Sequence, residues 1–148
     1  MINHRRRQLM AALTCVVLPP ALATPEALAA AISAFTGGAP HRAGKVRFEI
    51  AQLIDNGNAV PVTVSVDSPM TAAEHVTAIG LFNERNPSSD IAVFALGPRS
   101  GKAQVSTRIR LATSQRLVAL ARLSDGSYWS QAVDVIVTLA ACIEGEGP

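Results

Sequence analysis

The residue with the clearest chemical potential is Cys142, close to the C-terminal end of the sequence. If the first 23 residues are a cleaved export signal, Cys15 leaves with them and Cys142 is the single cysteine that the mature chain keeps. An odd cysteine in an exported protein calls for an explanation. A thiol just beyond the last strand, followed by a polar tail, suits covalent attachment of a small group that other proteins must reach. The alternative is a buried small hydrophobic side chain, and position alone does not decide between the two.

Other residues that could do acid–base or metal chemistry are scattered along the chain. His41 and His75 are the histidines beyond residue 23, and no Cys or His stands at metal-ligand spacing to either. The segment 97–102 resembles part of a phosphate loop, but three residues instead of four separate its glycines and Ala103 replaces the required hydroxyl. We therefore expect surface imidazoles, a hairpin turn at 97–101, and no catalytic residue, metal or bound cofactor.

The elements that must position Cys142 are strands. From Lys45 onward, apolar residues recur with a period of two, and segments rich in Gly, Pro, Asn and Asp separate the runs. The spacing predicts about seven strands in an antiparallel β-sandwich, an all-β fold. The predicted strands are 46–50, 60–66, 76–82, 91–96, 105–111, 117–123 and 132–139. The run 117–123 is almost continuously apolar and is also compatible with a helix, but its place between two strand-like runs favours a strand.

Two local features of these strands carry further predictions. Pro61 lacks a backbone donor, which places its strand at a sheet edge or Pro61 at the strand's beginning. Tyr128 and Trp129 are expected to plug the core, with a small recognition platform as the alternative. In the last strand, Val133, Val135, Val137 and Leu139 are expected to form one face, so that Cys142 follows where the strand stops.

The N-terminal part divides into an export signal and a helix. Residues 1–23 combine a basic stretch, an apolar stretch and a small-residue ending, with an arginine pair typical of twin-arginine signals. The apolar run is too short for a membrane anchor. Thr24, Pro25 and Glu26 then start a helix that Gly37 and Gly38 end. We predict a signal at 1–23, a single domain at 24–143 and a flexible acidic tail at 144–148; cleavage after Ala29 is the alternative.

Composition excludes several classes of protein. Charged residues make up 16% of the chain and hydrophobic residues 49%, which argues against a disordered protein. The formal net charge is +2, and it becomes nearly neutral once Arg5, Arg6 and Arg7 leave with the signal. The mature chain therefore has no basic patch that would indicate a nucleic acid or an anionic membrane as partner.

Several segments in the right order resemble the SoxY family, the sulfur-carrying proteins of bacterial thiosulfate oxidation, over nearly the whole mature chain. The matching segments are 58–64, 68–71, 86–87, 97–101, 106–112, 125–129 and 137–142, which include Asn58-Ala59-Val60-Pro61-Val62-Thr63-Val64 and the terminal Val137-Thr138-Leu139-Ala140-Ala141-Cys142.

The resemblance implies an immunoglobulin-like sandwich in the periplasm that pairs as a heterodimer with a second sandwich, SoxZ. It also implies that Cys142 is the covalent attachment site for sulfur compounds. In the family's cycle, a haem protein couples thiosulfate to the thiol, a hydrolase releases sulfate, and a sulfane dehydrogenase oxidises the remaining sulfur. The carrier itself is then not an enzyme and needs no cofactor beyond the adduct on its cysteine.

The chain departs from the family at its end. The family's terminal Gly-Gly-Cys-Gly-Gly is replaced by Ala140, Ala141, Cys142 and Ile143, which predicts a stiffer and bulkier carrier arm. Nearby Glu144 and Glu146 would disfavour the thiolate, the form that reacts.

Three hypotheses follow from this sequence. The first is a carrier that uses Cys142, and the second is a SoxY-like interaction module that assembles with a SoxZ-like partner but carries no sulfur. The third is a thiol enzyme in which His75 approaches Cys142 as a base.

Overall fold

The computed structural model describes residues 23–139, so the predictions for 1–22 and 140–148 lie outside the described residues. The described part holds one helix and nine strands. In chain order these are α1 (Pro25–Thr36), β1 (His41–Ala43), β2 (Val46–Glu49), β3 (Leu53–Ile54), β4 (Val60–Val66), β5 (Val76–Asn83), β6 (Asp90–Ala95), β7 (Gln104–Ile109), β8 (Gln115–Leu123) and β9 (Tyr128–Val137). The predicted all-β class is therefore confirmed. The helix is too short to span a membrane.

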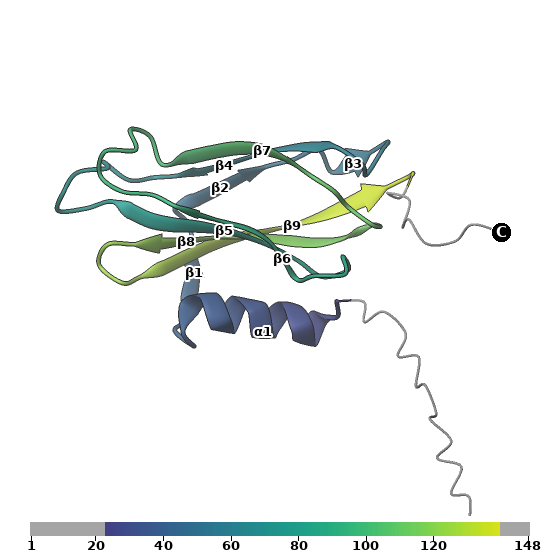
Figure 1. The fold of residues 1–148 in the computed structure, drawn as a ribbon, viewed down its shortest axis with the longest axis horizontal. Coiled ribbons are helices and arrows are strands. Elements are labelled where there is room, and N and C mark those ends of the chain that lie inside the picture. The colour runs from purple at the N-terminus through teal and green to yellow at the C-terminus, as the bar shows by residue number, and fades with distance from the viewer. Residues whose placement is uncertain (1–22, 140–148) are drawn as a thin grey trace, which may run out of the picture.

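The strands form two sheets that pack face to face. The larger sheet has the order β1-β9-β8-β5-β6, with β3 also paired to β9, and the smaller sheet has the order β2-β4-β7. Helix α1 lies on the outer face of the larger sheet, so the molecule has three layers (Figure 1). The main core lies between the sheets, where Val64 of β4 faces residues such as Ile79 and Leu117 of β5 and β8, all fully buried.

The helix begins and ends as its sequence predicts. The Thr24 hydroxyl accepts a hydrogen bond from the backbone N–H of Ala27 at 3.2 Å, and Pro25 occupies the first turn. Gly37 ends the helix in the left-handed conformation, with φ of 64°. The predicted apolar face, Leu28, Ile32 and Phe35, packs against the outer face of the larger sheet.

This helix explains why β8 is apolar on both faces. Leu117 faces the main core, whereas Val118 and Leu120 form a second cluster with Phe82 and Leu28 beneath α1. A strand covered on both faces reads as a continuous apolar run. The predicted strand at 117–123 is thus confirmed.

Three details differ from the predictions. The structure adds β1 and β3, which are too short to show an alternating pattern. The turn at 97–101 is not a hairpin, since β6 and β7 belong to different sheets. Strand β9 ends at Val137, so Leu139 lies beyond the strand and is 66% exposed instead of completing its inner face.

Pro61 lies at the beginning of β4, as one of its two predicted positions. The ladder between β4 and β2 starts only at Thr63, whereas β7 alone accompanies Pro61, opposite Arg108. The missing N–H of Pro61 therefore costs the sheet no bond to β2.

Candidate functional site

Backbone hydrogen bonds hold the last described residues in place where the chain leaves the larger sheet. The backbone N–H of Ile136 donates to the Gln52 carbonyl at 2.7 Å, and that of Thr138 donates to the Ile54 carbonyl at 2.9 Å. Gly57 then donates its N–H to the Leu139 carbonyl at 3.0 Å. The chain is thus held by backbone hydrogen bonds two residues past the end of β9.

Two side-chain hydroxyls complete this arrangement. The backbone N–H of Val137 donates to Ser114 Oγ at 2.8 Å, where the ladder between β8 and β9 has already ended. The Thr138 hydroxyl donates to the carbonyls of Ile54 and Asp55 at 3.4 and 3.2 Å. We call the set Gln52, Ile54, Gly57, Ser114 and Thr138 the exit clamp, because these residues fix the point where the chain leaves the sandwich.

The exit clamp limits where the predicted attachment site can be. Cys142 and its neighbours Ala140, Ala141 and Ile143 lie outside the described residues. Cys142 is the third residue after Leu139, and a fully extended chain advances at most about 3.6 Å per residue. The Cα of Cys142 is therefore within about 11 Å of the Cα of Leu139.

The two histidines of residues 23–139, His41 and His75, lie at the opposite end of the sandwich. His41 is paired in register with Tyr128, the first residue of β9, and β9 advances about 3.3 Å per residue over the nine residues to Val137. The Ser124 N–H donates to the carbonyl of His75 at 2.8 Å, in the turn between β8 and β9. About 30 Å of strand thus separates that turn from the exit.

This separation is too large for the thiol-enzyme hypothesis. An arm of about 11 Å cannot bring the Cys142 sulfur to either imidazole across about 30 Å. The histidines make local contacts instead: His41 Nδ1 lies 2.8 Å from Ser130 Oγ, and His75 Nδ1 lies 3.0 Å from the Thr71 carbonyl oxygen. A base for Cys142 supplied by His75 is therefore not supported.

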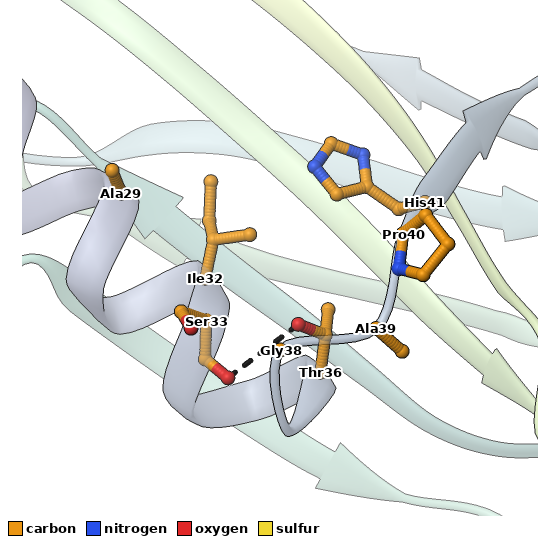
Figure 2. A pocket seen from close by; sticks show the side chains of 8 residues that line it. All are labelled: Ala29, Ile32, Ser33, Thr36, Gly38, Ala39, Pro40 and His41. Carbon is orange, nitrogen blue, oxygen red and sulfur yellow. Dashed lines mark hydrogen bonds between the residues drawn. The ribbon is translucent and has the colours of Figure 1, made fainter.

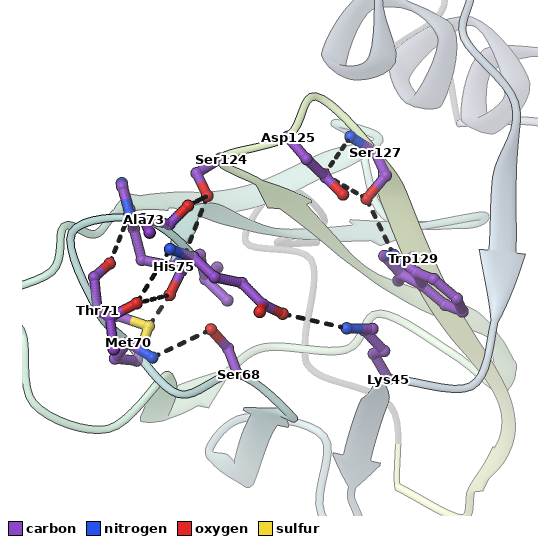
Figure 3. A network of polar contacts seen from close by, with 12 residues as sticks. Lys45, Ser68, Met70, Thr71, Ala73, His75, Ser124, Asp125, Ser127 and Trp129 are labelled. Atoms are coloured by element: carbon purple, nitrogen blue, oxygen red, sulfur yellow. Dashed lines mark hydrogen bonds and ion pairs between the residues drawn. The ribbon is translucent and has the colours of Figure 1, made fainter.

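The polar network around His75 closes the end of the sandwich far from the exit (Figure 3). The Thr71 hydroxyl accepts a hydrogen bond from the Glu74 backbone N–H at 3.0 Å, and Glu74 pairs with Lys45 at 3.5 Å. On the other side, Ser127 donates to Asp125, which lowers the pKa of that carboxyl. These hydrogen bonds and the ion pair join neighbouring loops, so the polar side chains of this network are bound to one another.

Tyr128 and Trp129 are half-buried and not fully enclosed in the core. Tyr128 packs edge-on against Phe35 of α1, with ring centroids 6.0 Å apart. The Trp129 ring packs at the margin of the main core and has the Arg42 guanidinium 4.7 Å and the Lys45 ammonium 5.6 Å from its centroid. Both rings therefore pack against the protein, as predicted, but at the margin of the core and not inside it. The Trp129 ring has Arg42 and Lys45 of the same chain beside it.

The described residues form several hollows on the surface. One of about 460 Å³ lies between the end of α1 and β1, lined by Ile32, Thr36 and His41 among others (Figure 2). In it the Thr36 hydroxyl is already used, donating to the Ser33 carbonyl at 3.5 Å. Within residues 23–139, no three His, Cys, Asp or Glu side chains gather to hold a metal ion.

Comparison with solved structures shows the fold that this sandwich resembles. A superoxide reductase (neelaredoxin) from Ignicoccus hospitalis superposes with a TM-score of 0.56 at 17% identity, covering 78% of this chain and 94% of that one. A putative superoxide reductase from Thermotoga maritima gives 0.55 at 17% identity, covering 70% and 89%. The superoxide reductase from Nanoarchaeum equitans gives 0.53 at 13% identity, covering 65% and 100%. At such identities the likeness shows a shared fold alone.

Sequence comparison is more specific. A comparison with curated proteins gives no match. The family model described as "Sulfur oxidation protein SoxY" matches residues 32–142, which run from the middle of α1 through both sheets and the exit clamp to Cys142. That match spans well over half of the chain and agrees in order with the segments singled out in the sequence. The chain belongs to the SoxY family of sulfur oxidation proteins.

Proposed function

We propose that this protein is a carrier that holds sulfur compounds as a covalent adduct on Cys142 during thiosulfate oxidation. The observation that carries the proposal is the exit clamp, which holds the chain at Leu139, three residues before the one cysteine that lies within the family match. A short arm on a fixed base presents its sulfur at a defined place. Such a place is what successive partner enzymes need.

The chemistry needs only a thiol from this chain. Loading joins the Cys142 sulfur to the outer sulfur of thiosulfate, which forms one S–S bond, releases the thiol proton and gives two electrons to a haem protein. Hydrolysis by a second enzyme then adds water, releases sulfate and a proton, and leaves a persulfide on Cys142. A sulfane dehydrogenase oxidises the remaining sulfur.

The residues around Cys142 define the arm. Ala140, Ala141 and Ile143 stand where the family has glycines, so the arm has fewer backbone conformations to choose from than a glycine arm. We propose that the partners of this carrier accept the added methyl and isobutyl groups. The SoxZ-like sandwich is the proposed stable partner, in a heterodimer of two immunoglobulin-like domains.

Export to the periplasm belongs to the same proposal. Leu28, on the inner face of α1, is buried against Phe82, Val118 and Leu120 of the larger sheet. Signal cleavage after Ala29 would remove Leu28 and uncover this cluster, whereas cleavage after Ala23 would leave it intact. We therefore favour a mature chain that starts at Thr24, whose side chain caps the helix.

A variant at the attachment site tests the proposal. Protein isolated from cells given thiosulfate should carry a sulfur-containing adduct that a reductant removes, and the Cys142→Ser variant should carry none. The variant should keep the thermal transition of the wild type, since Cys142 lies beyond the exit clamp. Equal adduct on wild type and variant would refute attachment at Cys142.

The second candidate is an interaction module that assembles with a SoxZ-like partner without carrying sulfur. The observation that favours it is a group of exposed leucine and isoleucine side chains around the exit, which could bind a protein whether or not the thiol is loaded. It predicts that partner binding survives Cys142→Ser and that the wild type never gains an adduct.

A further inference from the structure

Exposed large hydrophobic side chains are concentrated at the exit. Among the described residues, those with the greatest exposure are Leu53 at 62%, Val93 at 57%, Ile136 at 61% and Leu139 at 66%. Leu53 and Ile136 are partners in the parallel ladder between β3 and β9, so their side chains stand side by side on one face. Leu139 follows Ile136 by three residues. We call Leu53, Ile136 and Leu139 the apolar exit patch.

Isolated exposed hydrophobic residues are normal on a protein surface, but a cluster marks an interaction site. Val93 fits the first description, since it lies on β6, at the far edge of the sheet from β1 and β3. The apolar exit patch fits the second. Leu53 and Ile136 lie side by side next to the end of β9, and Leu139 lies two residues beyond that end, on the way to Cys142.

The surroundings of the patch favour an apolar partner surface over a strongly charged one. Asp134, two residues before Ile136 on the same face of β9, is bound to the Arg116 guanidinium through two hydrogen bonds of 2.9 and 3.2 Å. The charges of this pair largely offset each other. Asp55, in the turn after β3, also lies at the exit, where its backbone carbonyl accepts a hydrogen bond from the Thr138 hydroxyl.

The short distance between Leu139 and Cys142 indicates which proteins would cover the apolar exit patch. The Cα of Cys142 lies within about 11 Å of Leu139, which is close to the diameter of one helix with its side chains. A protein that places a reactive group on the Cys142 sulfur must therefore bring its own surface against the exit. The side chains it meets there include Leu53 and Ile136.

From this we infer that the apolar exit patch is the docking surface for the enzymes that react with the sulfur on Cys142, and that these enzymes present an apolar rim around their active-site entrance. The inference rests on the proposed carrier function and adds a location and a chemistry for its partners. Docking on apolar contacts would depend little on salt, since screening acts on charges.

A polar double variant tests this surface. Leu53→Gln removes apolar contact while keeping side-chain size, and Ile136→Thr removes apolar contact while keeping the β-branched shape suited to a strand. The matched control is Val93→Thr, a comparably exposed strand residue remote from the exit. Each variant replaces the wild-type protein in the organism that produces it. The cells receive a pulse of thiosulfate, and intact-mass measurements at successive times give the initial rate of adduct formation.

We expect the double variant to gain its adduct about tenfold more slowly than wild type, the range of loss typical when central interface contacts are removed, and the Val93→Thr control to match wild type. Labelling of Cys142 by a small thiol reagent should be the same in all three proteins. Equal adduct formation in wild type and double variant would overturn the docking surface. Loss of a co-purifying SoxZ-like partner from the double variant would also overturn it, because the patch would then bind the stable partner.

These outcomes separate the two proposals. A wild-type protein that never gains an adduct contradicts the carrier function itself. A wild type that gains one at the same rate as the double variant leaves the carrier function standing and removes only the docking surface.

Discussion

Replacing Ser114 with alanine should loosen the exit clamp without unfolding the sandwich. Ser114 Oγ accepts the hydrogen bond of the Val137 N–H at 2.8 Å, just beyond the last register pair of β8 and β9. Hydrogen bonds of this kind contribute about 1 kcal/mol net, because water replaces part of what is lost at an exposed position. That corresponds to about a fivefold higher population of locally open chain at residues 136–139.

Amide hydrogen exchange measures this change directly. In the Ser114→Ala variant, exchange at Val137 should be about fivefold faster, whereas amides of the central strand β5 should exchange as in wild type. Ser106→Ala is a matched control, because it removes a hydroxyl contact of 2.9 Å with Thr63 on the other sheet. An unchanged rate at Val137, or an equal acceleration throughout β5, would refute the account of the exit clamp.

Two further predictions concern packing and charge elsewhere in the fold. A Cβ at Gly80 would lie 2.6 Å from the Phe82 ring and 3.2 Å from the Phe35 ring, so Gly80→Ala should lower the unfolding free energy by about 1–3 kcal/mol, seen as a lower thermal transition. Gly97→Ala, which meets nothing within 4 Å, should not, and equal transitions for the two variants would contradict this account of the helix–sheet contact. The Arg116 guanidinium, through its hydrogen bonds and charge, holds the pKa of Asp134 below its ordinary value of 3.8. The stability that the pair adds is therefore present above that value and is lost as pH falls through the lower folded-state pKa. In Arg116→Ala, an NMR titration should show the pKa of Asp134 raised toward 3.8, while the pKa of Asp125, lowered by Ser127, stays unchanged; an Asp134 pKa that stays low would contradict the assignment.

Much of the fold can be predicted from the sequence, because a strand that is buried on one face has alternating apolar and polar residues. Strand β4, with its four inward valines, has the bounds that its alternation predicts. Strand β8 was the ambiguous element, and the reason is tertiary: α1 covers its outer face, so alternation is lost. Strands β1 and β3 escape prediction because two or three residues carry no period.

The candidate site can be predicted only in part from the sequence. Cys142 is singled out by its position and residue type alone. The exit clamp depends on contacts between residues far apart in the chain, such as Gly57 with Leu139, and a turn-forming glycine carries no signal of its distant partner. The exposure of Leu53 and Ile136 likewise follows from the short parallel pairing of β3 with β9, which their residue types do not indicate.

The most direct test of the carrier function is the intact mass of the native mature protein, isolated from cells given thiosulfate and measured with and without reductant. We expect a mass increase that the reductant removes and that fragmentation assigns to the peptide containing Cys142. The reduced mass should also match a chain that begins at Thr24. A single mass that is the same with and without reductant, with a free thiol at Cys142, would contradict the account.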